Sequence, residues 1–141
     1  ATGTIYDPLN ATLRMGPNTS ILLVDFDDNA PNSVSVYTDA LDQLGYTYTV
    51  LTANPSVAQL AAANLVIWFT GDSTSSAAFN STAETRLTTY LNNGGALILS
   101  SENYFTFSGG TVNTFMSNYL GVGAVVNNVN HTTLVGTGPF T

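Results

Sequence analysis

The two stretches that decide the fold are Ile21-Leu22-Leu23-Val24, which leads into Asp25-Phe26-Asp27-Asp28, and Leu65-Val66-Ile67-Trp68-Phe69, which leads into Thr70-Gly71-Asp72-Ser73. A strand that is apolar at every position is buried on both faces, and such strands belong to parallel sheets that lie under helices. We therefore expect both runs to be central strands, with Trp68 in the core. Each run ends in a polar turn at the carboxyl end of its strand.

Helix and strand patterns alternate around these two runs. We expect further strands at residues 46–51 and 96–99, and later ones near an edge of the sheet at residues 123–126 and 132–135. Helices are expected at four places: residues 34–44 capped by Ser33; a short segment opened by Asn54-Pro55-Ser56, with Val57, Leu60 and Ala61 facing inward; a segment starting at the capping box Ser81-Thr82-Ala83-Glu84 and ending at Gly94; and a segment capped by Thr111 that runs to Leu120.

This alternation predicts an α/β fold, a three-layer αβα sandwich around a mostly parallel sheet. Residues 1–20 show little periodicity and are expected to form an extended arm or an edge strand. We find no internal repeat and no linker, so residues 21–141 are expected to form a single domain, which suits a chain of 141 residues.

Charge is unusually scarce. Only 8% of the residues are charged, Lys is absent, Arg14 and Arg86 are the only arginines, and the net charge is −7. Binding of nucleic acid or of anionic lipid needs a basic surface, so we exclude both classes of partner. No Cys is present, which excludes disulfides and thiolate catalysis. No apolar run is long enough for membrane insertion.

The polar surface must consist of Thr, Ser and Asn, a composition that suits an extracellular or cell-surface location. The chain begins at Ala1 rather than Met, so we expect a processed secreted form or a piece of a longer protein. Four Asn-X-Ser/Thr sequons make the protein a candidate glycoprotein, with sites at Asn10, Asn18, Asn80 and Asn130.

Four segments together resemble a known family of domains. They are residues 21–28, residues 37–46, residues 65–72, and residues 90–100, which read Tyr-Leu-Asn-Asn-Gly-Gly-Ala-Leu-Ile-Leu-Ser. The pattern is similar to the class I glutamine amidotransferase-like domains of flavodoxin-like architecture found in large secreted bacterial and archaeal surface proteins and peptidases. The resemblance covers residues 20 to about 125 and implies a flavodoxin-like sheet. The catalytic Cys of the amidotransferases is missing, since Ser100-Ser101-Glu102 follows the fourth strand. The resemblance therefore implies an inactive relative.

Five of the nine carboxylates follow predicted strands and so gather at the carboxyl edge of the sheet. They are Asp25, Asp27, Asp28, Asp72 and Glu102. Two interpretations are open. The acids form a site for a hard divalent cation, Ca²⁺ or Mg²⁺, which is the only cofactor we consider. Alternatively, they shape turns and cap the helices that follow. An Asp nucleophile for phosphoryl transfer is disfavoured, because no Lys is present to neutralise phosphate.

A second arrangement consists of Ser101, His131 and an acid, either Glu102 or Asp72, as in a Ser hydrolase. The alternative is that His131 lies exposed in a polar loop. The aromatic residues Tyr104, Phe105 and Phe107 follow the fourth strand. They are expected either to plug the top of the core or to stack on sugar rings or on a partner surface.

The sequence leans against catalysis. It favours a non-catalytic structural or adhesive module of an extracellular or cell-surface assembly, either a polymer subunit or a domain of a larger secreted protein. Its expected partners are other copies of itself or neighbouring domains, and residues 4–13 or a late edge strand are candidates for strand addition between copies. The alternative function is a hydrolase that uses Ser101 and His131, or a metal-assisted acidic site.

Overall fold

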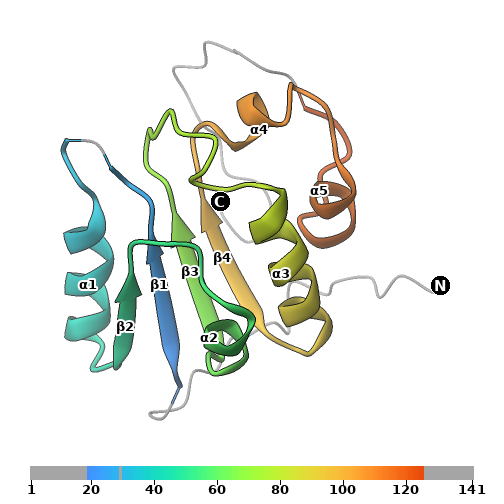
Figure 1. Cartoon of the computed structure of the whole chain (residues 1–141). Coiled ribbons are helices and arrows are strands. Elements are labelled where there is room, and N and C mark those ends of the chain that lie inside the picture. The colour runs from blue at the N-terminus through green and yellow to red at the C-terminus, as the bar shows by residue number, and fades with distance from the viewer. Residues whose placement is uncertain (1–18, 29, 126–141) are drawn as a thin grey trace, which may run out of the picture.

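The computed structural model describes residues 19–28 and 30–125 of the chain. Several predictions fall outside these residues: the arm at residues 1–18, the strand at residues 132–135, His131, and the sequons at Asn10, Asn18 and Asn130. Within the described residues, four parallel strands form one sheet in the order β2-β1-β3-β4 (Figure 1). The strands are β1 (Ile21–Asp25), β2 (Tyr48–Leu51), β3 (Leu65–Phe69) and β4 (Ala96–Ser100).

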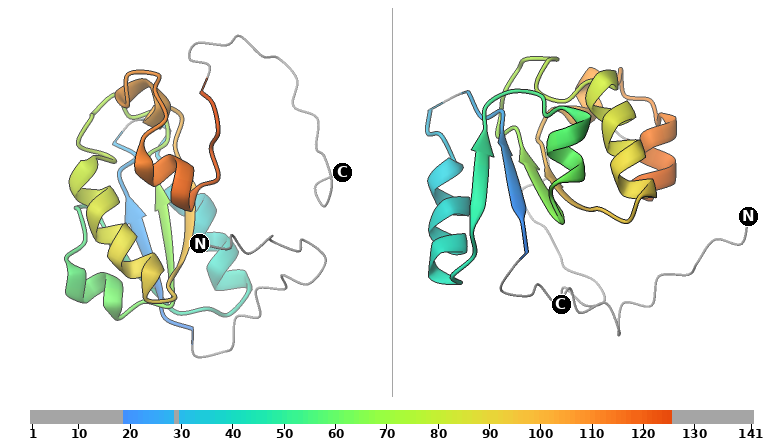
Figure 2. Two further views of the ribbon diagram at one scale, coloured as in Figure 1. Left: turned by 90° about the vertical axis from the view of Figure 1, so that its right-hand side faces the viewer. Right: turned by 60° about the horizontal axis from the view of Figure 1, so that its bottom comes forward.

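Helices cover both faces of this sheet (Figure 2). They are α1 (Val34–Gln43), α2 (Val57–Ala61), α3 (Ser81–Asn92), α4 (Tyr104–Phe107) and α5 (Thr114–Tyr119). Helix α1 lies on one face, and α2, α3 and α5 pack on the other. The α/β sandwich with a parallel sheet is thus confirmed. Its strand order matches the first four positions of the flavodoxin-like order 2-1-3-4-5.

The two apolar runs occupy the centre of the sheet, where every residue of β1 and β3 is buried. Successive side chains of a strand point to opposite faces, so each strand supplies two cores. Trp68 belongs to the core under α3, is 0% exposed, and its indole Nε1 donates a hydrogen bond of 3.0 Å to the Ala78 carbonyl. Phe69 belongs to the core under α1, where its ring stacks on Tyr37 with 4.2 Å between centroids.

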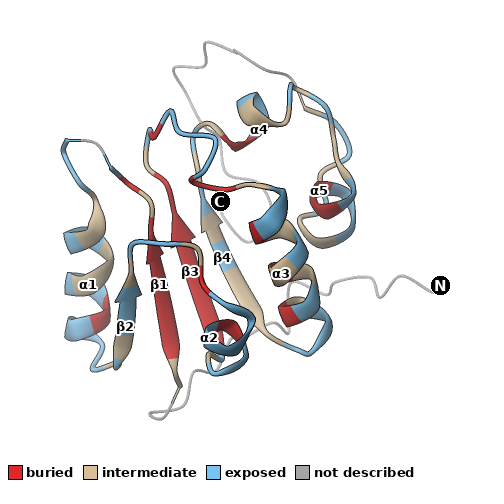
Figure 3. Cartoon of the chain, viewed as in Figure 1, coloured by how far each residue is buried: buried red, intermediate tan, exposed pale blue. Residues whose placement is uncertain are grey.

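Strand β4 is less well covered than the two central strands (Figure 3). Ile98 lies in register with the buried Ile67 on the α1 side of the sheet, yet it is 46% exposed. Helix α1 packs over residues of β1 and β3, and no other described element extends that layer across β4. Among the described residues, Ile98 of β4 is therefore an apolar side chain left exposed on this face of the sheet.

The short helix α2 is tied to α3 by a polar contact as well as by apolar packing. Its N-terminus carries a capping box, in which the Ser56 hydroxyl accepts from the Gln59 amide and the Gln59 side chain accepts from the Ser56 amide. From α3, Arg86 donates through Nη1 to the Pro55 carbonyl at 2.8 Å. The prediction for the inward face of α2 is wrong for two of three residues: Leu60 is buried, but Val57 is 55% exposed and Ala61 is exposed. A helix of five residues presents only one turn to the core.

Two predicted helix starts are also wrong. Helix α3 is capped by Asn80, whose Oδ1 accepts from the amides of Thr82 and Ala83, so Ser81 is the first helical residue and no Ser81–Glu84 box forms. Helix α5 is capped by Asn113 rather than Thr111. In both cases an Asn close to the expected cap takes its place.

Two smaller expectations also differ from the structure, and one helix was not expected. Ser33 stands at the N-cap position of α1, but its side chain makes no capping hydrogen bond. Helix α4 was not predicted, since four residues are too few for a periodic pattern. Residues 123–125 are not a strand, and residue 126 lies outside the described part.

Leu87 provides a test of the core beneath α3. It is 0% exposed, so Leu87→Ala is expected to lower the free energy of unfolding by about 2–5 kcal/mol through lost contacts and a residual cavity. Val57→Ala serves as the control and is expected to change the same quantity by no more than about 0.5 kcal/mol, because Val57 is exposed. Urea denaturation of the two variants measures both values. Equal losses would contradict the placement of these helices.

Candidate functional site

The loops after β1, β3 and β4 meet at the carboxyl edge of the sheet, the edge at which parallel α/β proteins bind ligands (Figure 1). Four of the five predicted acidic residues lie in these loops, and Asp25 is the last residue of β1. Hydrogen bonds join the end of β3 and the loop that follows it to the loops after β1 and β4. The resulting network determines what this edge can do chemically.

Asp27 organises the loop between β1 and α1. It is 4% exposed, and its Oδ2 accepts a hydrogen bond of 2.8 Å from the Ser33 amide and a second bond from the Ser33 hydroxyl. Its backbone carbonyl accepts from Asn32 Nδ2 at 2.9 Å. Asp25, which is also buried, accepts from the Asp27 amide through Oδ1 at 3.0 Å. Asp27 thus holds a backbone and a side-chain donor of its loop in place, and Asp25 holds a backbone donor.

Gly71 brings the loop after β3 against this carboxylate. Its φ is +51°, and a Cβ atom at this position would lie 2.5 Å from Asp27 Cγ and Oδ1. Only a residue without a side chain fits in such a contact. The backbone reinforces it, because the Phe26 amide donates to the Phe69 carbonyl at 3.0 Å. The β1 and β3 loops are therefore in direct contact.

The loops after β3 and β4 are joined in the same way. The Thr70 hydroxyl donates to the Ser101 hydroxyl at 2.7 Å, and the Glu102 amide donates to the Gly71 carbonyl at 3.2 Å. Asn103 Nδ2 donates to the carbonyls of Asp72 and Ser73, at 3.2 and 3.1 Å. Ser101 is half-buried, and its hydroxyl takes part in this contact between loops.

The five predicted metal ligands divide into two sets. Asp25 and Asp27 are buried in the hydrogen bonds just described, whereas Asp28, Asp72 and Glu102 are exposed. Among residues 19–28 and 30–125, no group of three or more His, Cys, Asp or Glu side chains is arranged to hold a metal ion. The contacts of Asp25 and Asp27 are those of the turn-forming alternative. The cation site stays a prediction, as does the arrangement of Ser101, Glu102 and His131, because His131 lies outside the described residues.

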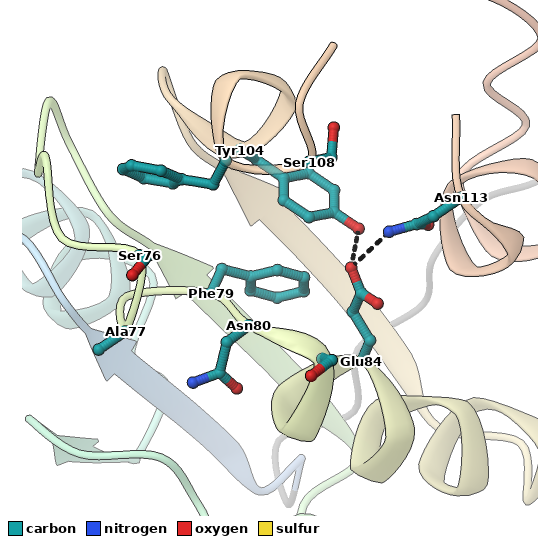
Figure 4. A pocket seen from close by; sticks show the side chains of 10 residues that line it. Ser76, Ala77, Phe79, Asn80, Glu84, Tyr104, Ser108 and Asn113 are labelled. Atoms are coloured by element: carbon teal, nitrogen blue, oxygen red, sulfur yellow. Dashed lines mark hydrogen bonds between the residues drawn. The ribbon is translucent and has the colours of Figure 1, made fainter. Parts of the chain in front are cut away.

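A cleft of about 470 Å³ lies beside this edge, between the start of α3 and the helices α4 and α5 (Figure 4). At its wall, Glu84 Oε1 accepts from the Tyr104 hydroxyl at 2.7 Å and from Asn113 Nδ2 at 2.8 Å. One carboxylate thus joins α3, α4 and the cap of α5. The residues that line the cleft are Ser76, Ala77, Phe79, Asn80, Ser81, Glu84, Tyr104, Phe107, Ser108 and Asn113.

Sequence reasoning missed this cleft because it assigned Glu84 to a capping box. Since Asn80 caps α3 instead, the Glu84 side chain is available to reach across to Tyr104 and Asn113. Burial raises the pKa of Tyr104 well above its ordinary value, and the hydrogen bond to Glu84 raises it further. Tyr104 is therefore a neutral donor to the carboxylate throughout the physiological pH range.

The aromatic residues after β4 differ in burial, so the structure supports the plugging role for Tyr104 and leaves stacking on a sugar or a partner as a prediction. Tyr104 is 4% exposed and packs edge-on against Phe79, with 4.7 Å between the ring centroids, so it plugs the core. Phe105 is 36% exposed, and Phe107 is half-buried in the wall of the cleft. The sequon residue Asn80 is half-buried at the edge of the same cleft.

Comparisons of the chain with protein-family models, with curated proteins and with solved structures found no match. The similarity to amidotransferase-like domains therefore stays a prediction from the sequence motifs. Among the described residues, no helix combines the length and apolar character needed to cross a membrane.

Gly71→Ala tests the contact between the β1 and β3 loops, and Gly94→Ala is its matched control. Both glycines have positive φ, +51° and +89°, but a Cβ at Gly94 meets nothing within 4 Å. Each variant is expected to lose about 1–2 kcal/mol from backbone strain. Gly71→Ala should lose about 1–3 kcal/mol more, because it displaces Asp27 from Ser33. Urea denaturation measures both losses, and equal values would show that the Asp27 contact contributes nothing.

Proposed function

We propose that this chain is a non-catalytic structural or adhesive module of an extracellular or cell-surface assembly, whose partners are copies of itself or neighbouring domains. One observation carries the proposal: at the edge of the sheet where α/β proteins bind substrates, the buried polar side chains are engaged in hydrogen bonds within and between its own loops. Asp25, Asp27 and Ser101 are all used in that network. The Thr-, Ser- and Asn-rich composition is consistent with an extracellular protein.

Strand β4 supplies a surface for association. Among the described residues it pairs with β3 alone, so the backbone donors and acceptors of its other side face away from the sheet. Natural edge strands are usually protected by charged residues or Pro, and β4 reads Ala-Leu-Ile-Leu-Ser, with neither. The opposite edge strand, β2, is one residue shorter than β4 and so offers a shorter edge for pairing. An apolar edge that is unpaired within residues 19–28 and 30–125 favours strand addition as the mode of association.

The proposed partner at β4 is a second copy of the chain. Two identical edges can pair antiparallel around a two-fold axis, the commonest symmetry of homo-oligomers. The exposed Ile98 side chain of each copy would then pack beside cross-strand neighbours from the other copy. Because β4 carries no charge, the net charge of −7 on each copy is not concentrated where the edges would meet.

Ile98→Lys tests this association, and Val36→Lys is the control. Both side chains are exposed apolar residues, at 46% and 67%, but Val36 lies on α1, away from the β4 edge. The wild-type chain is expected to dimerise as its concentration rises in sedimentation velocity runs. Ile98→Lys should weaken the dimer at least about tenfold, corresponding to about 1.4 kcal/mol, because it places a charge in the interface. A chain that stays monomeric, or equal effects of the two substitutions, would refute the role of β4.

Cation addition separates the module from the metal-assisted alternative. We expect millimolar Ca²⁺ or Mg²⁺ to leave the thermal unfolding midpoint unchanged, because Asp25 and Asp27 already bind their own loop. A cation at 100 times its Kd would instead stabilise the fold by about 2.7 kcal/mol. A clear rise that disappears in the double variant Asp28→Asn, Asp72→Asn would favour the metal site.

A further inference from the structure

The cleft beside α3 combines features that the proposed association through β4 does not use. Its polar groups come from three helices and from the loop before α3, and Glu84 connects them (Figure 4). Its volume of about 470 Å³ falls within the usual range for small-molecule sites, roughly 300–1,000 Å³. The nature of its ligand follows from the atoms that remain available in its wall.

Glu84 presents one carboxylate oxygen for a ligand. Its Oε1 is held by Tyr104 and Asn113, while its Oε2 accepts from no group in the part of the chain that the structure describes. Asn80 uses its Oδ1 to accept two helix amides, which leaves its Nδ2 as a donor at the edge of the cleft. Ser76 and Ser81, both exposed, add hydroxyl groups that donate and accept. The cleft therefore offers an acceptor, a donor and hydroxyl groups together.

Electrostatics favours a ligand without net charge. An anion would be repelled by the Glu84 carboxylate, and no Lys or Arg lines the cleft. A cation would be attracted by the Glu84 carboxylate but opposed by the positive N-terminal end of α3, a helix of twelve residues, and by the Asn80 Nδ2 donor. A neutral molecule rich in hydroxyl groups satisfies the acceptor and the donors without either repulsion.

The cleft also has apolar walls, made by Ala77, Phe79 and Phe107. Sugars combine hydroxyl groups with apolar C–H faces, and such faces pack on aromatic rings. We infer that this cleft binds one ring of a neutral sugar, with hydroxyl groups donating to Glu84 Oε2 and accepting from Asn80 Nδ2. This function goes beyond the proposed self-association and does not depend on it.

Two sources can supply such a ring. One is a glycan or free sugar on another molecule. The other is a sugar attached to this chain, because Asn80-Ser81-Thr82 is a sequon whose Asn80 Nδ2, the atom that becomes glycosylated, lies at the cleft. Glu84 Oε2 and the apolar walls would recognise the ring in both cases, whereas Asn80 Nδ2 donates a hydrogen bond in the first case and is the point of attachment in the second. The experiment therefore needs one arm for each source.

The first arm uses the ¹⁵N-labelled chain produced without glycosylation. It is titrated with glucose, galactose, mannose and N-acetylglucosamine, and with glucosamine and glucuronate as charged controls. At least one neutral sugar is expected to cause saturable shifts at the amides of Ser81, Glu84 and Ser108. Glucosamine and glucuronate should each bind at least about tenfold more weakly than that neutral sugar.

Two variants confirm the location of binding. Ser76→Trp is expected to fill the cleft and abolish the shifts, while Ser35→Trp on α1, on the other face of the sheet, should bind as the wild type does. If Ser76→Trp does not fold, Ser81→Trp at the exposed start of α3 replaces it. Binding that survives a folded cleft variant, or stronger binding of a charged sugar, overturns the inference.

The second arm uses the chain expressed in a host that glycosylates sequons. A mass increase that is lost in Asn80→Gln, together with shifts at Glu84 and Ser108 relative to the unglycosylated chain, assigns the sugar to Asn80 itself. Shifts with added sugar in the first arm assign it to another molecule. No response in either arm refutes the sugar site, and the β4 test is unaffected because Ile98 lies outside the cleft.

Discussion

The parallel pairing of β1 with β3 is the constraint from which the rest of the structure follows. Both strands are buried at every position, so helices must cover both faces of the sheet. The same pairing brings the loops after the two strands to one edge, where Asp27 and Gly71 meet. A buried carboxylate needs hydrogen-bond donors, and Ser33 supplies two of them. The acidic turn after β1 thus holds its loop in place at the edge of a sheet whose central strands are stabilised by apolar contacts.

The described residues offer three places of different chemistry. At the carboxyl edge the buried polar side chains are engaged in hydrogen bonds within and between loops, whereas the cleft at α3 keeps an acceptor and a donor available. The open side of β4 lies at a third place and is apolar. The cleft is joined to the core, because Phe79 and Tyr104 belong to both. This arrangement suits a module whose role is to hold partners.

The sequence was sufficient for features that depend on local composition. The runs that became β1 and β3 are apolar at every position, and no other element type fits a run so short, so strands and sheet class followed directly. The helix starts were harder, because Asn80 and Ser81 are adjacent residues that both favour the cap position. The cleft could not be found in this way. Glu84, Tyr104 and Asn113 are joined only by tertiary packing, and no short-range pattern links them.

The hydrogen bond from Arg86 to the Pro55 carbonyl has a consequence for cleavage of the chain by proteases. Proteases that cut after basic residues recognise an extended segment, and the chain offers them only Arg14 and Arg86. Arg86 lies inside α3, and its guanidinium donates to the Pro55 carbonyl, so the helix must unwind before the peptide bond after Arg86 can be cut. Within the described residues, resistance to such proteases therefore depends on the stability of α3. The scarcity of basic residues limits the sites that these proteases can cut, in a chain that has no Cys to form disulfides.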